Sequence, residues 1–303
     1  MTKTSKSLVF FGSGLVAFET LLFLSDIFDI ETVVTKNNPA HHREPAPVEE
    51  YAKTNSINLL FADNQGELDR IFSKSKRSNR CGIVVDYGVI ISKKVIDLFS
   101  LGIMNSHFSL LPEWRGADPI TYSLLSGQNK TGVSLMLINE DLDDGPIIAQ
   151  TIVPIIDSYT NESLTKKLIS ASNELLKTYI PPYLNGQIIS SSQINNLVTY
   201  SRKIDKKDSY IDWGKPAPVL EREIRAFSTW PKSHCKIGAL EVVVTSACAK
   251  KGSIPVGKWT IDGNRLQIGC RTGILEILEL KPLGKNTMPT ESFINGYSNR
   301  LFG

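Results

Sequence analysis

The chain has 303 residues, 41% of them hydrophobic and 21% charged, with a formal net charge of +3. This length and composition favour two globular domains and exclude a disordered or collagen-like chain. The four cysteines form no Cys-x-x-Cys pair and have no metal-like spacing to the four histidines, so we expect neither a disulfide framework nor a metal site. Because no apolar run reaches the ~18 residues of a membrane span, we expect a cytoplasmic protein without membrane attachment.

The first half alternates predicted strands and helices. Apolar runs predict strands at 7–11, 29–35, 81–85, 103–105 and 132–138, and helices are expected at 15–24, 93–99, 120–125 and 161–184. This alternation is typical of a doubly wound, mostly parallel α/β sheet, in which ligands bind at the carboxyl ends of the strands. Gly12-Ser13-Gly14 follows the first strand, but Ala17 replaces the third glycine of a dinucleotide motif. We interpret these glycines as a tight turn that lets the backbone approach a ligand.

The composition changes after residue 184. Residues 185–196 are rich in Ser, Asn, Gln and Gly, as linkers are. A helix at 218–226 and short strands at 240–246, 257–261, 266–269 and 275–280 follow, with turn signals at Asp262-Gly263 and Thr272-Gly273. This pattern predicts a small antiparallel barrel of the oligonucleotide-binding class. We therefore expect a catalytic domain over 1–184, a linker over 185–202 and a C-terminal barrel over 203–303.

The positive charge lies in the last third of the chain. Residues 203–303 contain 16 Lys and Arg against 10 Asp and Glu, whereas the remainder contains 18 and 21. A basic domain favours a polyanionic partner, although ordinary solvated lysines and arginines explain the same excess equally well. Candidate phosphate contacts are Arg225, Lys232 and Lys236.

Three residues with side chains suited to catalysis lie close together in the first half of the sequence. Asn105 and His107 lie two residues apart at the end of a predicted strand, so both side chains point to one face, and Asp143 follows in the run Asp141 to Gly145. An amide beside an imidazole can stabilise the oxyanion formed when a carbonyl is attacked, and a carboxylate can fix the imidazole tautomer. The set predicts acyl transfer without a covalent enzyme intermediate. A purely structural histidine is the alternative.

The order of these motifs resembles a known family. Asn105-x-His107 followed by Ser109-Leu110-Leu111-Pro112, with Leu142-Asp143-x-Gly145 downstream, is similar to the signature of the folate-dependent formyltransferases. The second half resembles the members that formylate methionyl-tRNA, through Ile211-Asp212-Trp213, Trp230-Pro231 and Gly284-Lys285-x-x-Met288. The resemblance covers nearly the whole chain, from Phe10 to Gly296.

The resemblance implies that a formyl group passes from 10-formyltetrahydrofolate to the α-amino group of methionine on initiator tRNA, without a metal. It implies that Asn105, His107 and Asp143 are catalytic. The folate contacts that it implies are Ser109, Leu110, Leu111, Pro112, Tyr87, Gly88 and Leu142. We expect a monomer.

The chain departs from the family pattern at two places that bear on function. The loop after the second strand, which in the family contacts the tRNA, is short here and contains one arginine, Arg43. Asp86 stands where the family commonly has Ala. The alternatives left open are a formyltransferase that acts on an amino-sugar nucleotide and a non-catalytic RNA-binding module. The basic C-terminal third favours tRNA over a sugar nucleotide.

Overall fold

The computed structural model describes residues 7–38, 46–78 and 80–301. Arg43 therefore lies outside the described residues. The chain divides into two compact units, each built from several segments. Unit 1 comprises Met1–Pro119, Lys130–Pro154 and Thr165–Ser201, and unit 2 comprises Ile120–Asn129, Ile155–Leu164 and Arg202–Gly303. The domain boundaries predicted at 184 and 202 stay a prediction.

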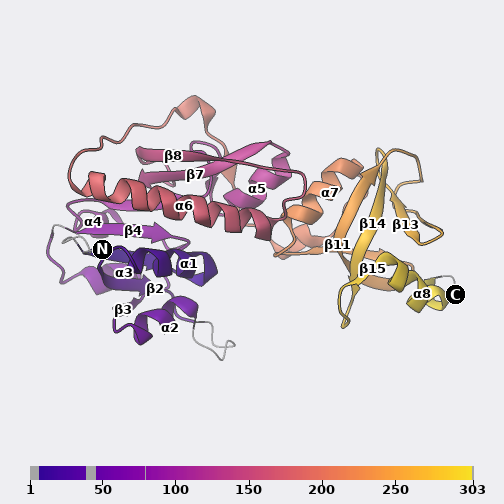
Figure 1. Cartoon of the computed structure of the whole chain (residues 1–303), viewed down its shortest axis with the longest axis horizontal. Helices are drawn as coiled ribbons and strands as arrows, with labels where there is room; N and C mark the ends of the chain where they lie inside the picture. Colours follow the sequence, from indigo (N-terminus) through magenta and orange to yellow (C-terminus); the bar gives the residue numbers. More distant parts are fainter. Residues whose placement is uncertain (1–6, 39–45, 79, 302–303) are drawn as a thin grey trace. The chain divides into compact units, whose positions relative to one another are not determined.

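Unit 1 is built on a seven-stranded sheet with the order β3-β2-β1-β4-β5-β7-β8 (Figure 1). The first five strands in this order are parallel, and β7 and β8 run antiparallel to their neighbours. Their bounds are β1 (Leu8–Gly12), β2 (Ile30–Thr35), β3 (Asn58–Phe61), β4 (Cys81–Val85), β5 (Ile103–His107), β7 (Lys130–Leu137) and β8 (Ile147–Pro154). The predicted doubly wound, mostly parallel sheet is confirmed.

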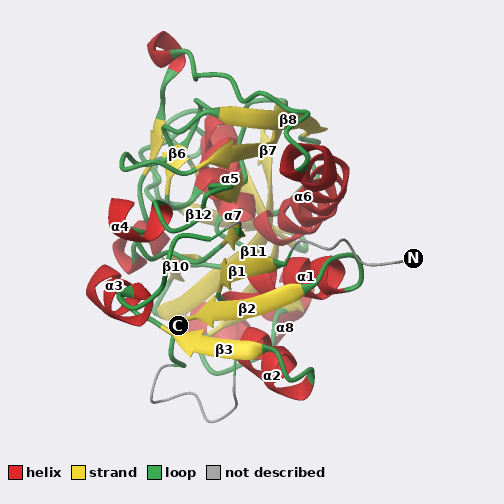
Figure 2. Ribbon diagram, turned by 90° about the vertical axis from the view of Figure 1, so that its left-hand side faces the viewer, coloured by secondary structure: helices red, strands yellow, loops and turns green. Residues whose placement is uncertain are grey.

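Helices cover both faces of this sheet. Figure 2 shows α1 and α6 on one side and α3 and α4 on the other. The helices of the first 184 residues are α1 (Gly14–Ser25), α2 (Pro47–Thr54), α3 (Gln65–Phe72), α4 (Lys93–Ile96), α5 (Pro119–Ser126) and α6 (Asn161–Leu184). Phe11 on β1 is fully buried and contacts the rings of Phe72, Tyr87 and Phe99, which makes an aromatic core on one face. The sequence did not predict α2, α3, β3 or β8, because these elements are short or only half-buried.

The residues predicted as a linker pack against unit 1. Ser191 and Ile147, at the start of β8, exchange two backbone hydrogen bonds of 2.7 and 2.8 Å. Further on, β9 (Tyr200–Ser201) pairs in parallel with β6 (Arg115–Gly116). We call residues 191–201 the return segment, since the chain here runs back along unit 1 after α6 (Figure 1).

Unit 2 contains an antiparallel sheet with the order β10-β11-β14-β13-β12, and β15 pairs with β14. The elements after residue 202 are η2 (Lys206–Ser209), α7 (Ala217–Ala226), β10 (Ser233–Ile237), β11 (Leu240–Lys250), β12 (Trp259–Asp262), β13 (Arg265–Gly269), β14 (Ile274–Pro282), β15 (Met288–Pro289) and α8 (Thr290–Leu301). Alternate residues of the strands point into a core with Leu220 and Ile224 of α7 and Phe293 of α8. The predicted antiparallel class is confirmed, and β10 and α8 were not predicted. Within the described residues, no helix is both long and apolar enough to span a membrane.

Candidate functional site

Strand β5 presents Asn105 and His107 on one face at its carboxyl end. The intervening Ser106 points to the other face, where its Oγ lies 2.7 Å from the Oγ of Ser172 on α6. The strand lies between β4 and β7 in the sheet, and only 6% of the His107 side chain is exposed. The period of two therefore directs both functional side chains away from α6, as the sequence predicted.

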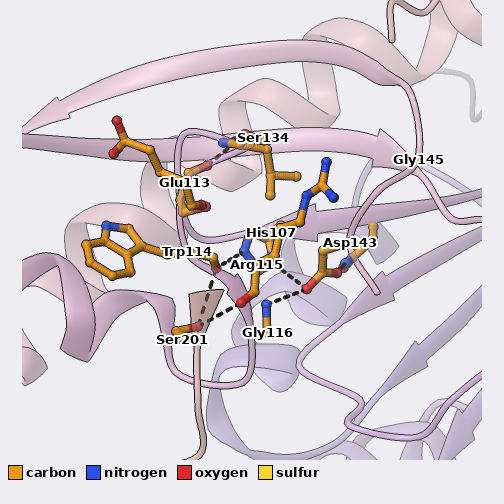
Figure 3. Close-up of polar contacts among 12 residues, drawn as sticks. His107, Glu113, Trp114, Arg115, Gly116, Ser134, Asp143, Gly145 and Ser201 are labelled. Atoms are coloured by element: carbon orange, nitrogen blue, oxygen red, sulfur yellow. Dashed lines mark hydrogen bonds and ion pairs between the residues drawn. The ribbon is translucent and has the colours of Figure 1, made fainter. Parts of the chain in front are cut away.

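Asp143 joins these two residues from the loop between β7 and β8. Its Oδ1 accepts a hydrogen bond from Asn105 Nδ2 at 3.3 Å, and its Oδ2 accepts one from the backbone N–H of Gly116 at 2.9 Å. The Nδ1 atom of His107 lies 3.6 Å from Oδ2 (Figure 3). The structure thus brings the three predicted catalytic side chains together. Asp143 has a φ of +49°, and the nearby Gly145 passes so close to the backbone of Leu137 that a Cβ there would clash.

The backbone orients the ring of His107. Its Nε2 lies 2.9 Å from the carbonyl oxygen of Trp114. A carbonyl can only accept, so Nε2 carries the hydrogen and Nδ1 faces Asp143. A distance of 3.6 Å is long for a hydrogen bond. The arrangement therefore fixes the orientation of the ring, with Nδ1 toward the Asp143 carboxylate.

The loop Ser109 to Pro112 is held from β7 and β8. The Oγ of Ser134 accepts from the N–H of Leu111 at 2.9 Å and donates to the carbonyl of Ser109 at 2.7 Å. Gln150 donates through Nε2 to the carbonyl of Leu111 and to Ser134 Oγ, both at 2.8 Å. Neither Ser134 nor Gln150 could be predicted from the sequence, because a single polar residue on a strand has no distinctive pattern.

The predicted folate-contacting residues differ in what they can offer. Tyr87 is buried and its hydroxyl donates to the carbonyl of Ala62 at 3.0 Å, so its side chain belongs to the core and only its backbone can meet a ligand. Gly88 follows with a φ of +68°. Leu142 is 61% exposed, and Ser109 and Leu111 are buried. Leu110 and Pro112 are half-buried, so Leu142 is the most exposed of the predicted aliphatic contacts.

Asp86 ends β4 beside the glycine turn after β1. Its carbonyl accepts a 3.1 Å hydrogen bond from the N–H of Ser13, and its φ is +47°. Burial raises the pKa of its carboxyl group to about 6, with Lys36 lowering it and Asp118 raising it further. Asp86 itself is exposed, so solvent screens this shift. The turn thus places a titratable group at the carboxyl end of the sheet.

The predicted tRNA-contacting residues of unit 2 differ in availability. Arg225 on α7 binds both carboxylate oxygens of Glu221, at 2.6 and 3.0 Å, and donates to the carbonyl of Tyr159 at 2.8 Å. Lys232 has a φ of +75° and donates to the carbonyl of Ser228. Lys236 lies on edge strand β10, where its side chain is exposed between two buried neighbours. Of these three, Lys236 is the best placed to meet a phosphate.

Two family models match this chain. Residues 26–180 match the Formyl transferase family, and residues 203–298 match the family Formyl transferase, C-terminal domain. The chain belongs to the formyl transferase family. The first match covers β2 to α6 and therefore includes Asn105, His107 and Asp143, and the second covers the sheet of unit 2.

Relatives within the formyl transferase family extend over almost the whole chain. A methionyl-tRNA formyltransferase of Myxococcus xanthus is 31% identical over 295 residues, which cover 96% of this chain and 95% of that protein. One from Wigglesworthia glossinidia brevipalpis is 33% identical over 292 residues, or 91% of each chain. A solved structure of a sugar 3N-formyl transferase, WlaRD, with dTDP and 5-N-formyl-THF has a TM-score of 0.72 at 20% identity, covering 93% of this chain and all of that one. At that identity it shows the shared fold alone.

Proposed function

We propose that this formyl transferase passes a formyl group from 10-formyltetrahydrofolate to the α-amino group of methionyl-initiator tRNA. The observation that carries the proposal is the meeting of Asn105, His107 and Asp143 at the end of β5. Two relatives named as methionyl-tRNA formyltransferases align over more than nine-tenths of this chain and support tRNA as the acceptor. The structure of the sugar formyl transferase WlaRD was solved with 5-N-formyl-THF, a folate derivative, which supports a folate donor. We also infer that the protein is a monomer and acts in the cytoplasm.

The reaction needs an oxyanion to be stabilised. The acceptor amine, after losing a proton, attacks the formyl carbon, and its new C–N bond converts the carbonyl into a tetrahedral oxyanion. The amide of Asn105 has a second N–H besides the one that binds Asp143. In the proposed mechanism His107 acts in its protonated form and adds a positive charge. Groups fixed in place before the reaction stabilise such a charge without reorganising, and removing one typically costs about 10²–10³-fold in rate.

The reaction also needs protons to be moved. Once the amine nitrogen is bonded to the formyl carbon it must lose a further proton, and N10 of the folate must gain one when its bond to the formyl carbon breaks. The Asp143 carboxylate, 3.6 Å from Nδ1 of His107, is the group that we propose to orient the ring and to accept the proton of the amine. Proton-transfer groups of this kind typically contribute about 10²–10⁴-fold.

A formylation assay with 10-formyltetrahydrofolate and methionine-charged initiator tRNA tests the proposal, with a parallel reaction on an amino-sugar nucleotide. We expect formyl-methionyl-tRNA, and a decrease of kcat by about 10²–10⁴-fold in Asn105→Ala and His107→Ala with folate binding retained. Asn185→Ala, an exposed residue beyond α6, is the control. Activity on the sugar alone, or near-normal turnover of the two variants, would contradict the proposal.

A further inference from the structure

Gln193 lies in the return segment, and its amide uses its full hydrogen-bonding capacity. Its Nε2 donates to the carbonyl oxygens of Asp143 and Gly145, both at 2.8 Å. Its Oε1 accepts from Nε and from a terminal nitrogen of Arg115, at 3.1 and 2.8 Å. A primary amide has two donor hydrogens and two acceptor lone pairs, so these four bonds saturate it.

The two donated bonds hold the loop that carries the catalytic carboxylate. They lie on either side of Asp144, at residues 143 and 145. Asp143 has a φ of +49°, a conformation that is uncommon for residues other than glycine and that persists where surrounding contacts enforce it. The Gln193 amide is such a contact. It lies 50 positions after Asp143 and 48 positions after Gly145 in the chain.

The two accepted bonds hold the opposite side of the site. Arg115 is 5% exposed, and its guanidinium also forms a 2.5 Å ion pair with Asp144. The next residue, Gly116, donates the backbone hydrogen bond to Asp143 Oδ2. Gln193 thus connects the main chain of the Asp143 loop to the side chain of Arg115. The residue after Arg115, Gly116, supplies the N–H that binds the Asp143 carboxylate.

We propose that Gln193 is a positioning residue for formyl transfer, which acts by holding the Asp143 carboxylate in register with His107 and Asn105. The inference rests on the proposed function, because it concerns the same catalytic group. It also places the return segment in the active site. A displacement on the order of 1 Å at a catalytic group can lower the rate by about 10²-fold.

Two substitutions separate the donated bonds from the accepted ones. Gln193→Ala removes all four bonds, and we expect kcat to fall about 10- to 100-fold with a smaller change in KM. Gln193→Glu can still accept from Arg115 but has no hydrogen to donate, and it sets a carboxylate against two carbonyl oxygens. If the role is to hold the Asp143 loop, Glu will be at least as impaired as Ala. Gln187→Ala, an exposed glutamine just after α6, is the matched control and should retain full activity.

A double-mutant cycle with Asp143→Ala tests whether Gln193 acts through Asp143. We expect Gln193→Ala to change kcat by less than about 3-fold in the Asp143→Ala background, because the group being positioned is gone. A merely structural role would produce the same fold-change in both backgrounds. Single-turnover measurements at high enzyme concentration, with thermal unfolding of each variant, give the rates and the folded fraction.

The outcomes distinguish this inference from the proposed function. If the wild-type protein does not formylate methionyl-tRNA, the proposed function fails, whether or not it formylates an amino sugar. If the wild-type protein is active, the inference is overturned by near-normal turnover of Gln193→Ala or by recovery of activity in Gln193→Glu. Equal effects of Gln193→Ala in both backgrounds would overturn it as well.

Discussion

The backbone N–H of Gly116 donates to Oδ2 of Asp143 at 2.9 Å, so the catalytic carboxylate is held by main chain as well as by side chains. This contact depends on Gly116 being glycine. Its φ is +116°, and a Cβ built on it would lie 2.3 Å from the carbonyl oxygen of Ser201. The absence of a side chain at Gly116 therefore allows β9 of the return segment to pair closely with β6.

Gly116→Ala is expected to lower both activity and stability. The added methyl group forces apart β6 and β9, which displaces the N–H that binds Asp143. We expect kcat to decrease by about 10²-fold and the free energy of unfolding by about 1–3 kcal/mol. Steady-state formylation and urea denaturation measure the two effects.

Gly186→Ala is the matched control for this substitution. Gly186 also has a positive φ, +71°, but an added Cβ meets no atom within 4 Å. We expect a small loss of stability from backbone strain and unchanged kcat. A Gly116→Ala protein with normal turnover would mean that the Asp143 carboxylate does not need the Gly116 N–H.

Arg225→Ala is expected to affect stability rather than tRNA binding. The guanidinium is already engaged with Glu221 and the carbonyl of Tyr159, so its loss leaves these groups without a partner. We expect the free energy of unfolding to fall by about 1–3 kcal/mol, with little change in the salt dependence of the KM for methionyl-tRNA. A clearly weaker salt dependence at unchanged stability would show that Arg225 reaches the phosphates instead.

Lys236→Ala is expected to affect tRNA binding rather than stability. Its exposed side chain on β10 can neutralise a phosphate, and each such contact adds about one to the slope of log affinity against log salt. We expect a higher KM for methionyl-tRNA, a slope reduced by about 1 and unchanged unfolding. Measurement of the KM over a salt series decides, and an unchanged slope would remove Lys236 from the interface.

Asp86 is expected to make the stability depend on pH. Its pKa rises from 3.8 to about 6 on folding, so between these values the folded state binds more protons than the unfolded state. Stability must then decrease as the pH rises from about 4 to about 6 and stay lower above it. Because Asp86 is exposed, solvent screening reduces the size of the effect.

Asp86→Asn removes this titration. The quantity compared is the free energy of unfolding of the variant minus that of the wild-type protein. We expect this difference to be more favourable to the variant at pH 7.5 than at pH 4.5. Urea denaturation at both pH values measures it, and Asp157→Asn, an exposed carboxylate after β8, is the control. Equal differences at the two pH values would show that the ionised Asp86 costs the folded state nothing.

The sequence by itself determined the class of each sheet, several of the elements and the order of the motifs. The 3.6-residue period predicted α6 with the bounds that it has, and the period of two placed Asn105 and His107 on one face of β5. The order of motifs indicated the family. These features could be predicted because the spacing of apolar residues along a helix or strand shows which of its faces is buried.

Only the tertiary structure decided which polar groups meet. Arg115 and Gln193 are 78 residues apart, and Ser134 reaches Leu111 across 23 residues. In the sequence Gln193 is one more polar residue in a linker-like stretch, and Arg225 is one more cation. Hydrogen bonds are directional and depend on the relative placement of distant segments, so no local period encodes them. That placement engages Arg225 within unit 2 and brings Gln193 to the carboxylate of the active site.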